Sequence, residues 1–504
     1  MSSPIAIIPE GQRVNGHRPW PRFVVAEEAW RHTASEIAAG RATLFGLWGD
    51  NSDGPVVHMA MIDDATGEIA VVSLPCPAGK FPSVGAVHPP AIRLERALHS
   101  LYGFEPVGAP DTRPWLDLGF WDVQHPLGDR AAAPAERTAY RFLPTEGEAL
   151  HQIPVGPVHA GIIEPGHFRF TASGETVVRL EQRLGYVHKG IESLMAGATI
   201  EKAARLAART SGDSTVAYGI AFAHAVEAAA NAEAPPRAHY LRALMAELER
   251  LANHFGDIGA ICNDASFSLM HAHCGILREQ VLRAAAACFG HRLMMDRVVP
   301  GGVANDLTAE GAARIHEAVQ ETRVRFPRLV ELYDNTTSLQ DRTAGTGIVT
   351  AALARQFGAP GYVGRASGRN FDARKTPGYA PYNELDFVVP VLADGDVNAR
   401  VWLRIREVEQ SLALIDRIIA RLPEGPIAAA LDPGSGEGLG LAEGFRGDVL
   451  VSVRLDGGKI ARCHLRDPSW FQWPLLEAAI EGNIVADFPL CNKSFNCSYS
   501  GHDL

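Results

Sequence analysis

The sequence is poor in cysteine, and none of its cysteines stands in a Cys-x-x-Cys pair. The seven cysteines are odd in number and scattered, at positions 76, 262, 274, 288, 463, 491 and 497. This pattern argues against a disulfide framework and favours a reducing compartment. It also indicates that the chain holds no iron–sulfur cluster of its own, since such clusters need four well-placed thiolates.

The sequence also lacks the long apolar runs of a membrane protein. No stretch approaches the ~20 apolar residues of a membrane-spanning helix, and the first twenty residues lack the pattern of a signal peptide. A formal net charge of -11 argues against a nucleic-acid partner. No glycine-rich phosphate loop stands between a strand and a helix, so we expect no nucleotide site. We therefore expect a soluble chain that can dock on a membrane protein.

The first part of the chain mixes strand and helix patterns. Short apolar runs predict three strands between residues 42 and 75, namely "ATLFGLWG", "PVVHMAMID" and "IAVVSLP". Apolar spacing predicts a helix over residues 89–104, which begins at a proline pair and ends at Gly103. We therefore predict a small α+β domain over residues 1–130. The polar stretch 131–150 is the predicted linker.

Residues 151–504 have a mainly helical pattern. A short β-like opening leads into long helical runs, and the last sixty residues return to strand and loop patterns. The expected helices cover residues 191–209, 214–232, 236–260, 275–295, 308–335 and 400–421. The predicted fold class is α+β, with a helical bundle that carries a small β element built from both of its ends.

Several motifs in this second part keep a fixed order. They include "GPVHAGIIEPGHFRF" (156–170), "GYVHKGIE" (185–192), "LMAELERLANHFGDIGAICNDASF" (244–267) and "ADFPLCNKSFNCSYSGHDL" (486–504). Over about 350 residues this part resembles the large subunit of nickel–iron hydrogenases. It is most similar to the membrane-bound, formate-hydrogenlyase (group 4) type and to the hydrogenase-like peripheral-arm subunit of respiratory complex I. The resemblance implies an oxidoreductase of the complex I and membrane-bound-hydrogenase superfamily.

The first part carries a second resemblance. The stretch "ERALHSLYGFEPVGAPDTRPWL" (95–116) is similar to the complex I subunit that packs beside the first one. Fusion of the two subunits is characteristic of the formate-hydrogenlyase large subunit. The resemblance implies an iron–sulfur small subunit and membrane ion-translocating subunits as partners. It also implies a cytoplasmic chain, peripheral on the inner face of the cytoplasmic membrane.

The thiolates that hold nickel and iron in this family are missing. The first pair falls on Ser211 and Ser214 in "RTSGDSTVAY", and the second pair falls on Ser498 and Gly501 in the tail. A register shifted by one would recover Cys497 as a single ligand. A serine hydroxyl has a far higher pKa than a thiol, so it is a hard and mostly protonated ligand. The resemblance therefore implies that nickel–iron is absent and that the chain binds no cofactor of its own.

A structural role also explains the replacement residues. Ser211, Asp213 and Ser214 belong to the types preferred at helix N-caps, and a helical run begins directly after them. We expect them to cap that helix.

Complex I has lost the same thiolates, and there the emptied cavity receives the quinone head group. The resemblance implies a candidate pocket of Asp264, Glu164 and one of the two hairpin histidines, His159 or His167. A buried carboxylate beside imidazoles can titrate near neutrality and relay protons. Both histidines are equally open to a structural role in the hairpin.

Five further residues are supporting candidates for this pocket. The tyrosine that contacts quinone in complex I falls on Gly212 here, and Tyr218 follows a turn later. We expect packing contacts from His188 and Glu192 in "HKGIE". We expect Arg365 and Arg374, with Asp372 and Asp386 as partners, to form an ion-pair network that holds a long loop.

Two hypotheses from different classes follow. In the first, an iron–sulfur partner brings electrons to the emptied cavity, where a quinone or similar acceptor takes them up with protons. In the second, the chain is a non-catalytic scaffold between an iron–sulfur subunit and a membrane arm. A hydrogenase with an altered metal site ranks third, because the thiolates are missing.

Overall fold

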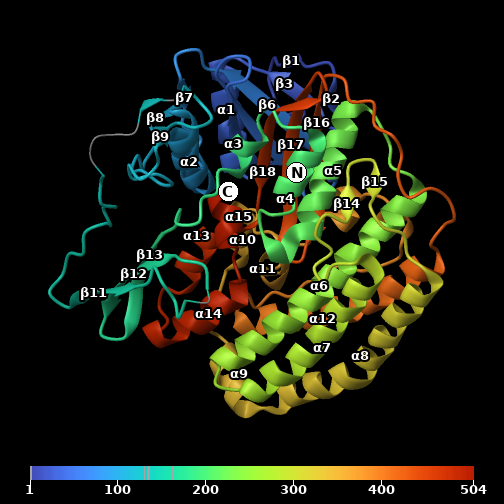
Figure 1. The fold of residues 1–504 in the computed structure, drawn as a ribbon. Coiled ribbons are helices and arrows are strands. Elements are labelled where there is room, and N and C mark those ends of the chain that lie inside the picture. The colour runs from blue at the N-terminus through green and yellow to red at the C-terminus, as the bar shows by residue number, and fades with distance from the viewer. Residues whose placement is uncertain (1–2, 130, 133–136, 162) are drawn as a thin grey trace.

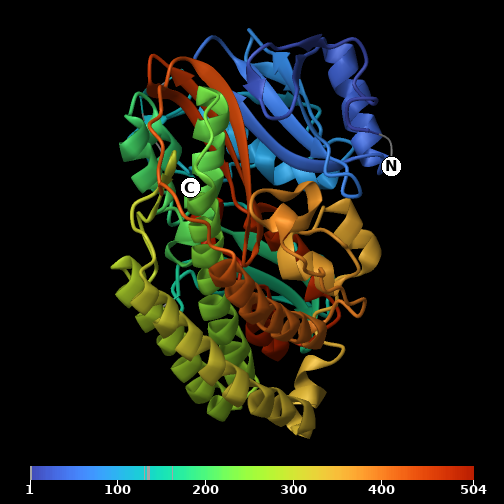
Figure 2. The ribbon, with the colours of Figure 1, turned by 90° about the vertical axis from the view of Figure 1, so that its right-hand side faces the viewer.

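The computed structural model describes residues 3–129, 131–132, 137–161 and 163–504. It combines helices and strands, and the predicted α+β class is confirmed. The N-terminal unit lies at one end of the molecule and the long helices α6, α7, α8 and α12 lie at the other (Figure 1; Figure 2). No helix within the described residues is long and apolar enough to cross a lipid bilayer.

The N-terminal unit is built on a five-stranded sheet in the order β1-β3-β6-β5-β4. The three predicted strands are confirmed as β4, β5 and β6, and the predicted helix as α2, which ends at Gly103 in the left-handed conformation. The elements of this unit are β1 (Gln12–Arg13), β2 (His17–Arg18), β3 (Arg22–Val24), α1 (Glu27–Ala38), β4 (Thr43–Asp50), β5 (Val56–Ile62), β6 (Ile69–Pro75), β7 (Lys80–Pro82), η1 (Pro89–Ala91), α2 (Ile92–Tyr102), β8 (Glu105–Val107), β9 (Val123–Gln124) and β10 (Ala131–Ala132).

This unit is joined closely to the rest of the chain. Strand β2 pairs in parallel with β16 (Gly436–Gly444), so the N-terminus adds an edge strand to the C-terminal sheet. One hydrophobic core contains Trp30 of α1 together with Trp473 and Phe488 from the C-terminal region. The predicted linker, residues 131–150, lies partly outside the described residues, and 137–149 carry no helix or strand.

The predicted helical runs correspond to α3 and α4, α5, α6, α7, α8 and α12, with shifted ends. Helix α7 differs most, since it begins seven residues before the predicted start and ends at Gly290, which adopts a left-handed conformation. The helices are α3 (Ile191–Met195), α4 (Ile200–Ala207), η2 (Gly212–Ser214), α5 (Thr215–Ala230), α6 (Pro236–Asp264), α7 (Ser268–Phe289), α8 (Ala309–Asn335), α9 (Thr337–Thr343), α10 (Ala351–Gln356), α11 (Gly361–Ala366), η3 (Arg374–Gly378), η4 (Tyr382–Glu384), α12 (Val397–Ala420), α13 (Ser469–Ala479), η5 (Val485–Asp487), α14 (Phe488–Phe495) and α15 (Tyr499–Asp503).

The two ends of this part supply two separate sheets. The opening hairpin forms a three-stranded sheet of β11 (Leu150–Val155), β12 (His167–Ser173) and β13 (Thr176–Arg183). The C-terminal strands β16, β17 (Gly447–Asp456) and β18 (Lys459–Arg466) pair instead with β2, and β14 (Val298–Val299) pairs with β15 (Gly302–Val303). The prediction of strand and loop in the tail was wrong beyond β18, because residues from Ser469 onward form mainly short helices.

Helix α5 packs directly on strand β16. Alternating glycines on the strand meet alanines at every fourth position of the helix, and added Cβ atoms would collide with carbonyl oxygens of α5. At Gly438 that atom would lie 1.9 Å from the Ala225 oxygen, and at Gly440 it would lie 2.0 Å from the Ala221 oxygen. Helix α5 can lie this close to β16 only because glycines leave the facing side of the strand without side chains. This close packing holds α5 and the loop that precedes it in place.

We expect Gly438→Ala to destabilise the chain by about 1–3 kcal/mol, because the added methyl forces α5 away from the sheet. Urea unfolding followed by circular dichroism measures this change. Gly434→Ala is the matched control, because its Cβ would meet nothing within 4 Å. Equal stability of the two variants would contradict the packing described here.

Candidate functional site

The predicted ligand positions come together where two loops meet. The hydroxyl oxygens of Ser211 and Ser498 lie 3.1 Å apart, and the Gly501 amide donates to the Ser498 oxygen at 2.9 Å. Both serines are buried. This geometry favours the register that places the second pair of ligand positions at Ser498 and Gly501.

An ion pair cross-links the two loops. The Arg446 guanidinium donates to both carboxylate oxygens of Asp213 at 2.8 and 2.6 Å, and to the Ser214 hydroxyl at 3.2 Å. It also donates to the backbone carbonyl of Asn496 in the C-terminal loop. Burial would raise the pKa of Asp213, but the charge and hydrogen bonds of Arg446 hold it below its ordinary value. An ion pair therefore lies beside the serines, and Ser211 and Ser214 donate to its carboxylate.

A side chain at the fourth position would require Asp467 to move. A Cβ on Gly501 would lie 2.3 Å from a carboxylate oxygen of Asp467. The same oxygen accepts a hydrogen bond from the Tyr218 hydroxyl at 2.6 Å. Burial, and then the Asp467 charge, raise the pKa of Tyr218 well above its ordinary value, so the phenol stays protonated. Tyr218 thus contacts the site through Asp467.

The expected capping by serine was wrong. Ser214 occupies the N-cap position of α5, but its side chain makes no capping hydrogen bond. The carboxylate of Glu249, from α6, accepts instead from the amides of Val216 and Ala217 at 2.7 and 3.1 Å. Burial raises the pKa of Glu249 to about 8. The serine hydroxyls are consequently free to bond Asp213, Arg446 and each other.

These donors do not match a nickel–iron centre. Such a centre needs four soft thiolates, whereas the four positions here supply three hydroxyls and one glycine. Cys497, adjacent to Ser498, is buried in a hydrophobic core, and burial raises the pKa of its thiol. Within the described ranges, no group of three or more His, Cys, Asp or Glu side chains is arranged to hold a metal ion.

Glu164 lies at the rim of this site. Its carboxylate accepts from the Ser500 amide at 3.1 Å, directly between the two C-terminal ligand positions. The expectation of a buried carboxylate was wrong, since Glu164 is exposed in this chain. Lys189 is nearby, and its ammonium donates to the Thr210 carbonyl at 2.8 Å, one residue before Ser211.

The two hairpin histidines have different surroundings. The His159 ring is bonded to the Gly166 carbonyl at 2.7 Å and stays within the hairpin loop. The His167 ring is bonded to the Gly156 carbonyl at 3.3 Å and lines a cavity together with Trp121 and Tyr140. Burial lowers the pKa of His167 below its ordinary value.

Asp264 stands apart from the other candidates. It is the last residue of α6 and is half-buried, and burial raises its pKa while Lys493 opposes the shift. In the described part of the chain, no hydrogen bond or ion pair joins it to Glu164, His159 or His167. The structure therefore brings Glu164 to the serines and leaves Asp264 on the α14 side.

His188 and Glu192 hold neighbouring segments in place. The Glu192 carboxylate binds Arg462 and His464 of β18 at 2.7 and 2.9 Å. Burial alone would raise its pKa, but these partners lower it to about 2. The His188 ring stacks on Trp121 and is bonded to the Asp503 carbonyl at 2.8 Å.

Arg365 and Arg374 belong to a fully buried network of ion pairs. Arg365 binds Glu407 of α12 at 2.7 Å, and Arg374 binds Asp372 at 2.7 Å. Asp386, the other expected partner, forms no ion pair with either arginine in the part of the chain that the structure describes. The prediction that Asp386 pairs with Arg365 or Arg374 was therefore wrong.

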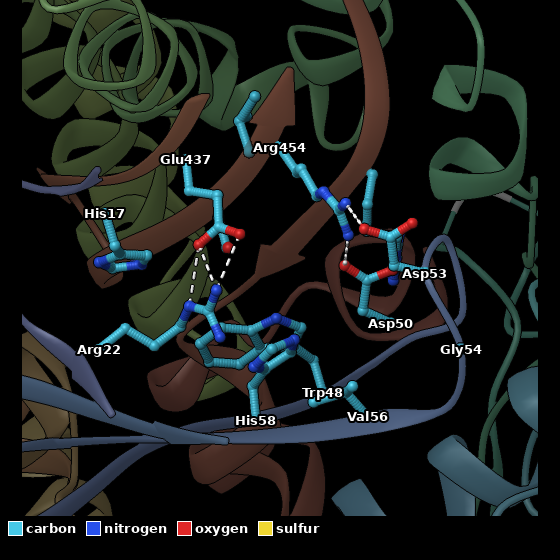
Figure 3. Close-up of a pocket in the computed structure, with 13 residues that line it drawn as sticks. His17, Arg22, Trp48, Asp50, Asp53, Gly54, Val56, His58, Glu437 and Arg454 are labelled. Atoms are coloured by element: carbon cyan, nitrogen blue, oxygen red, sulfur yellow. Dashed lines mark hydrogen bonds and ion pairs between the residues drawn. The ribbon is translucent and has the colours of Figure 1, made fainter. Parts of the chain in front are cut away.

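A charged pocket, which the sequence did not predict, lies at the junction between the N-terminal unit and the C-terminal sheet. It has a volume of about 210 Å³, and Arg22 pairs across it with Glu437 through two hydrogen bonds of 2.8 Å (Figure 3). His17 and His58 also line it, and burial lowers the pKa of His58 to about 3. Only the paired sheets bring these residues together, so local sequence carries no signal for them.

The two side chains of the Asp213–Arg446 pair are unequally exposed, so we expect their substitutions to change stability by unequal amounts. Asp213→Asn leaves a guanidinium that is only 5% exposed without its counter-charge, whereas Arg446→Gln leaves a carboxylate that is 36% exposed. We expect losses of about 3 and about 1–2 kcal/mol in unfolding free energy, respectively. The double variant should lose less than the sum. Urea unfolding of the three variants measures this coupling, and strict additivity would contradict a direct interaction.

Comparisons with known proteins show which family this chain resembles. The family described as the 49 kDa subunit of respiratory-chain NADH dehydrogenase matches residues 265–433. Component G of hydrogenase-4 from Escherichia coli is 31% identical over 437 residues, which cover 84% of this chain and 76% of that protein. An NADH-quinone oxidoreductase subunit from Desulfotalea psychrophila is 33% identical over 352 residues, which cover 68% of this chain and 93% of that protein.

A solved structure is also similar. It is a chain of the membrane-bound sulfane sulfur reductase, an archaeal respiratory membrane complex, with a TM-score of 0.67 and 25% identity. The match covers 71% of this chain and 99% of that chain.

Proposed function

This chain belongs to the family of the respiratory-chain NADH dehydrogenase 49 kDa subunit and the related hydrogenase subunits, and from that premise we propose an electron-transfer function without nickel. The chain passes electrons from an iron–sulfur partner subunit to a quinone or a similar acceptor. It sits peripherally on the inner face of the cytoplasmic membrane, beside ion-translocating subunits. The relatives are named as quinone oxidoreductase, hydrogenase and sulfane sulfur reductase components, which supports a redox role and leaves the acceptor open.

One observation carries the proposal. The four ligand positions are occupied by three serines and a glycine, with the Ser211–Ser498 contact of 3.1 Å and the Arg446 guanidinium between the loops. Protonated hydroxyls are poor ligands for a soft metal ion, and here Ser211 and Ser214 donate to the Asp213 carboxylate while Ser498 donates to Ser211.

Four residues are the candidate proton-transfer groups of this proposal. Reduction of a quinone to a quinol takes two electrons and two protons. Glu164 at the rim, with His159 or His167 on the hairpin, supplies protons from the solvent side. Asp264 has a raised pKa and supplies the second route, beside Lys493.

The Asp264→Asn variant tests this assignment in the intact complex. We expect at least a tenfold loss of quinone reduction, because a positioned proton donor typically contributes 10²-fold or more. Asp334→Asn, at an exposed position of α8, is the control and should leave turnover unchanged. Copurification of the partner subunits verifies assembly of both variants.

The scaffold hypothesis is favoured by the direct contacts that fill the ligand positions. It predicts unchanged quinone reduction in an assembled Asp264→Asn complex. That result would contradict a redox role for this residue.

A further inference from the structure

A buried charge cluster joins the helices α6, α11 and α12 to the end of strand β16. No member of the cluster is more than 2% exposed, and hydrogen bonds or ion pairs connect all of them. The cations are Arg250, Arg365 and Arg374, the carboxylates are Glu247, Asp372, Glu407 and Glu443, and His254 is the remaining titratable group. Four carboxylates therefore face three guanidinium groups.

The arginines around the cluster do not supply the missing charge. Each of them has a carboxylate of its own, in the pairs Arg369–Asp64, Arg404–Asp257 and Arg466–Asp448. A buried carboxylate that lacks its own cation is costly in its ionised form. The excess of one carboxylate therefore predicts that one proton is bound within the cluster.

Glu407 is held in its ionised form. Its carboxylate accepts two hydrogen bonds from Arg365 at 3.0 and 2.7 Å, one from Arg250 at 3.3 Å and one from His254 at 2.7 Å. Burial would raise the pKa of Glu407, but the Arg365 charge and then His254 hold it well below its ordinary value. The Nδ1 atom of His254 is buried without a partner, so a second proton on this ring would leave a buried N–H unpaired.

Arg374 holds two further carboxylates in their ionised form. It donates to both oxygens of Asp372 at 3.0 and 2.7 Å, and to Glu247 at 2.9 Å. Glu247 also accepts from the hydroxyls of Tyr382 and Ser411, each at 2.6 Å. Charge-assisted hydrogen bonds of this kind favour the carboxylate over the acid.

Glu443 has the weakest support for a negative charge. Its two oxygens accept from Arg365 at 2.8 Å and from the Ala373 amide at 3.1 Å, and Arg365 is shared with Glu407. Burial, and then the Asp372 charge, raise the pKa of Glu443 to about 7. The charged and titratable groups that face it are Arg250 of α6, Arg365 of α11, Asp448 of β17, and Arg369, Asp372 and Tyr379 of the segments between α11 and η4.

We propose that Glu443 is a protonated carboxylic acid at neutral pH, and that the release of its proton above neutrality makes this cluster a pH-responsive element of the fold. The ionised form adds a fourth negative charge and competes with Glu407 for Arg365. Helix α6, which enters the cluster, also carries Glu249, whose carboxylate binds the first turn of α5. The charge on Glu443 therefore acts on the helix that holds the serine loop. This element is independent of the function proposed for the serines.

Infrared spectroscopy of the purified full chain tests the protonation state directly, because a protonated carboxyl has a carbonyl stretch that a carboxylate and an amide lack. At about pH 6 we expect Glu443→Gln to lose one such band from the parent spectrum. In the parent chain the same band should fade as the pH rises through about 7. Glu317→Gln, at an exposed position of α8, is the control and should keep the band. A Glu443→Gln spectrum that lacks no such band would overturn the proposal.

The pH dependence of thermal unfolding gives a second test. Unfolded Glu443 ionises near its ordinary pKa of 4.5, whereas folded Glu443 keeps its proton up to a pKa of about 7, so the parent chain loses stability between these values. We expect Glu443→Gln to melt close to the parent at about pH 5 and above it at about pH 8, whereas Glu317→Gln should follow the parent throughout. Parallel profiles of Glu443→Gln and the parent, or a Glu443→Gln chain that does not fold at about pH 5, would contradict a neutral Glu443.

Discussion

The ion pair between Arg446 and Asp213 is the interaction on which the central site depends. In hydrogenases the metals cross-link the two ligand loops, and here a guanidinium joins them through Asp213, Ser214 and the Asn496 carbonyl. In this chain the link between the loops is therefore an internal ion pair. The serine hydroxyls lie beside this ion pair, and Ser211 and Ser214 donate to its carboxylate.

The surrounding fold holds these loops at their positions. Helix α5 lies directly on β16 through glycine–alanine contacts, and its first turn is bonded by Glu249 of α6. The loop of Ser211–Ser214 is therefore fixed by a sheet on one side and by a buried carboxylate on the other. Tyr218 and Asp467 close the remaining position at Gly501, so the packing leaves little freedom for a different donor set.

Local patterns in the sequence predicted the regular elements well and the contacts between them poorly. Strands β4–β6 and helix α2 could be predicted because apolar spacing and proline or glycine boundaries are local signals. The prediction that serines cap α5 was wrong because the carboxylate of Glu249, from helix α6, accepts hydrogen bonds from the first amides of α5. The prediction for the tail was wrong because helices α14 and α15 are short and are stabilised by burial rather than by helix propensity. The Arg22–Glu437 pair depends entirely on tertiary structure.

The most direct test of a redox subunit without nickel is the metal content of the complex purified from its native host. Elemental analysis should count nickel and iron per copy of this chain. The account predicts iron in amounts that fit partner clusters and no stoichiometric nickel. Nickel near one atom per chain would contradict it, and would require ligands other than the serines at the meeting point of the two loops.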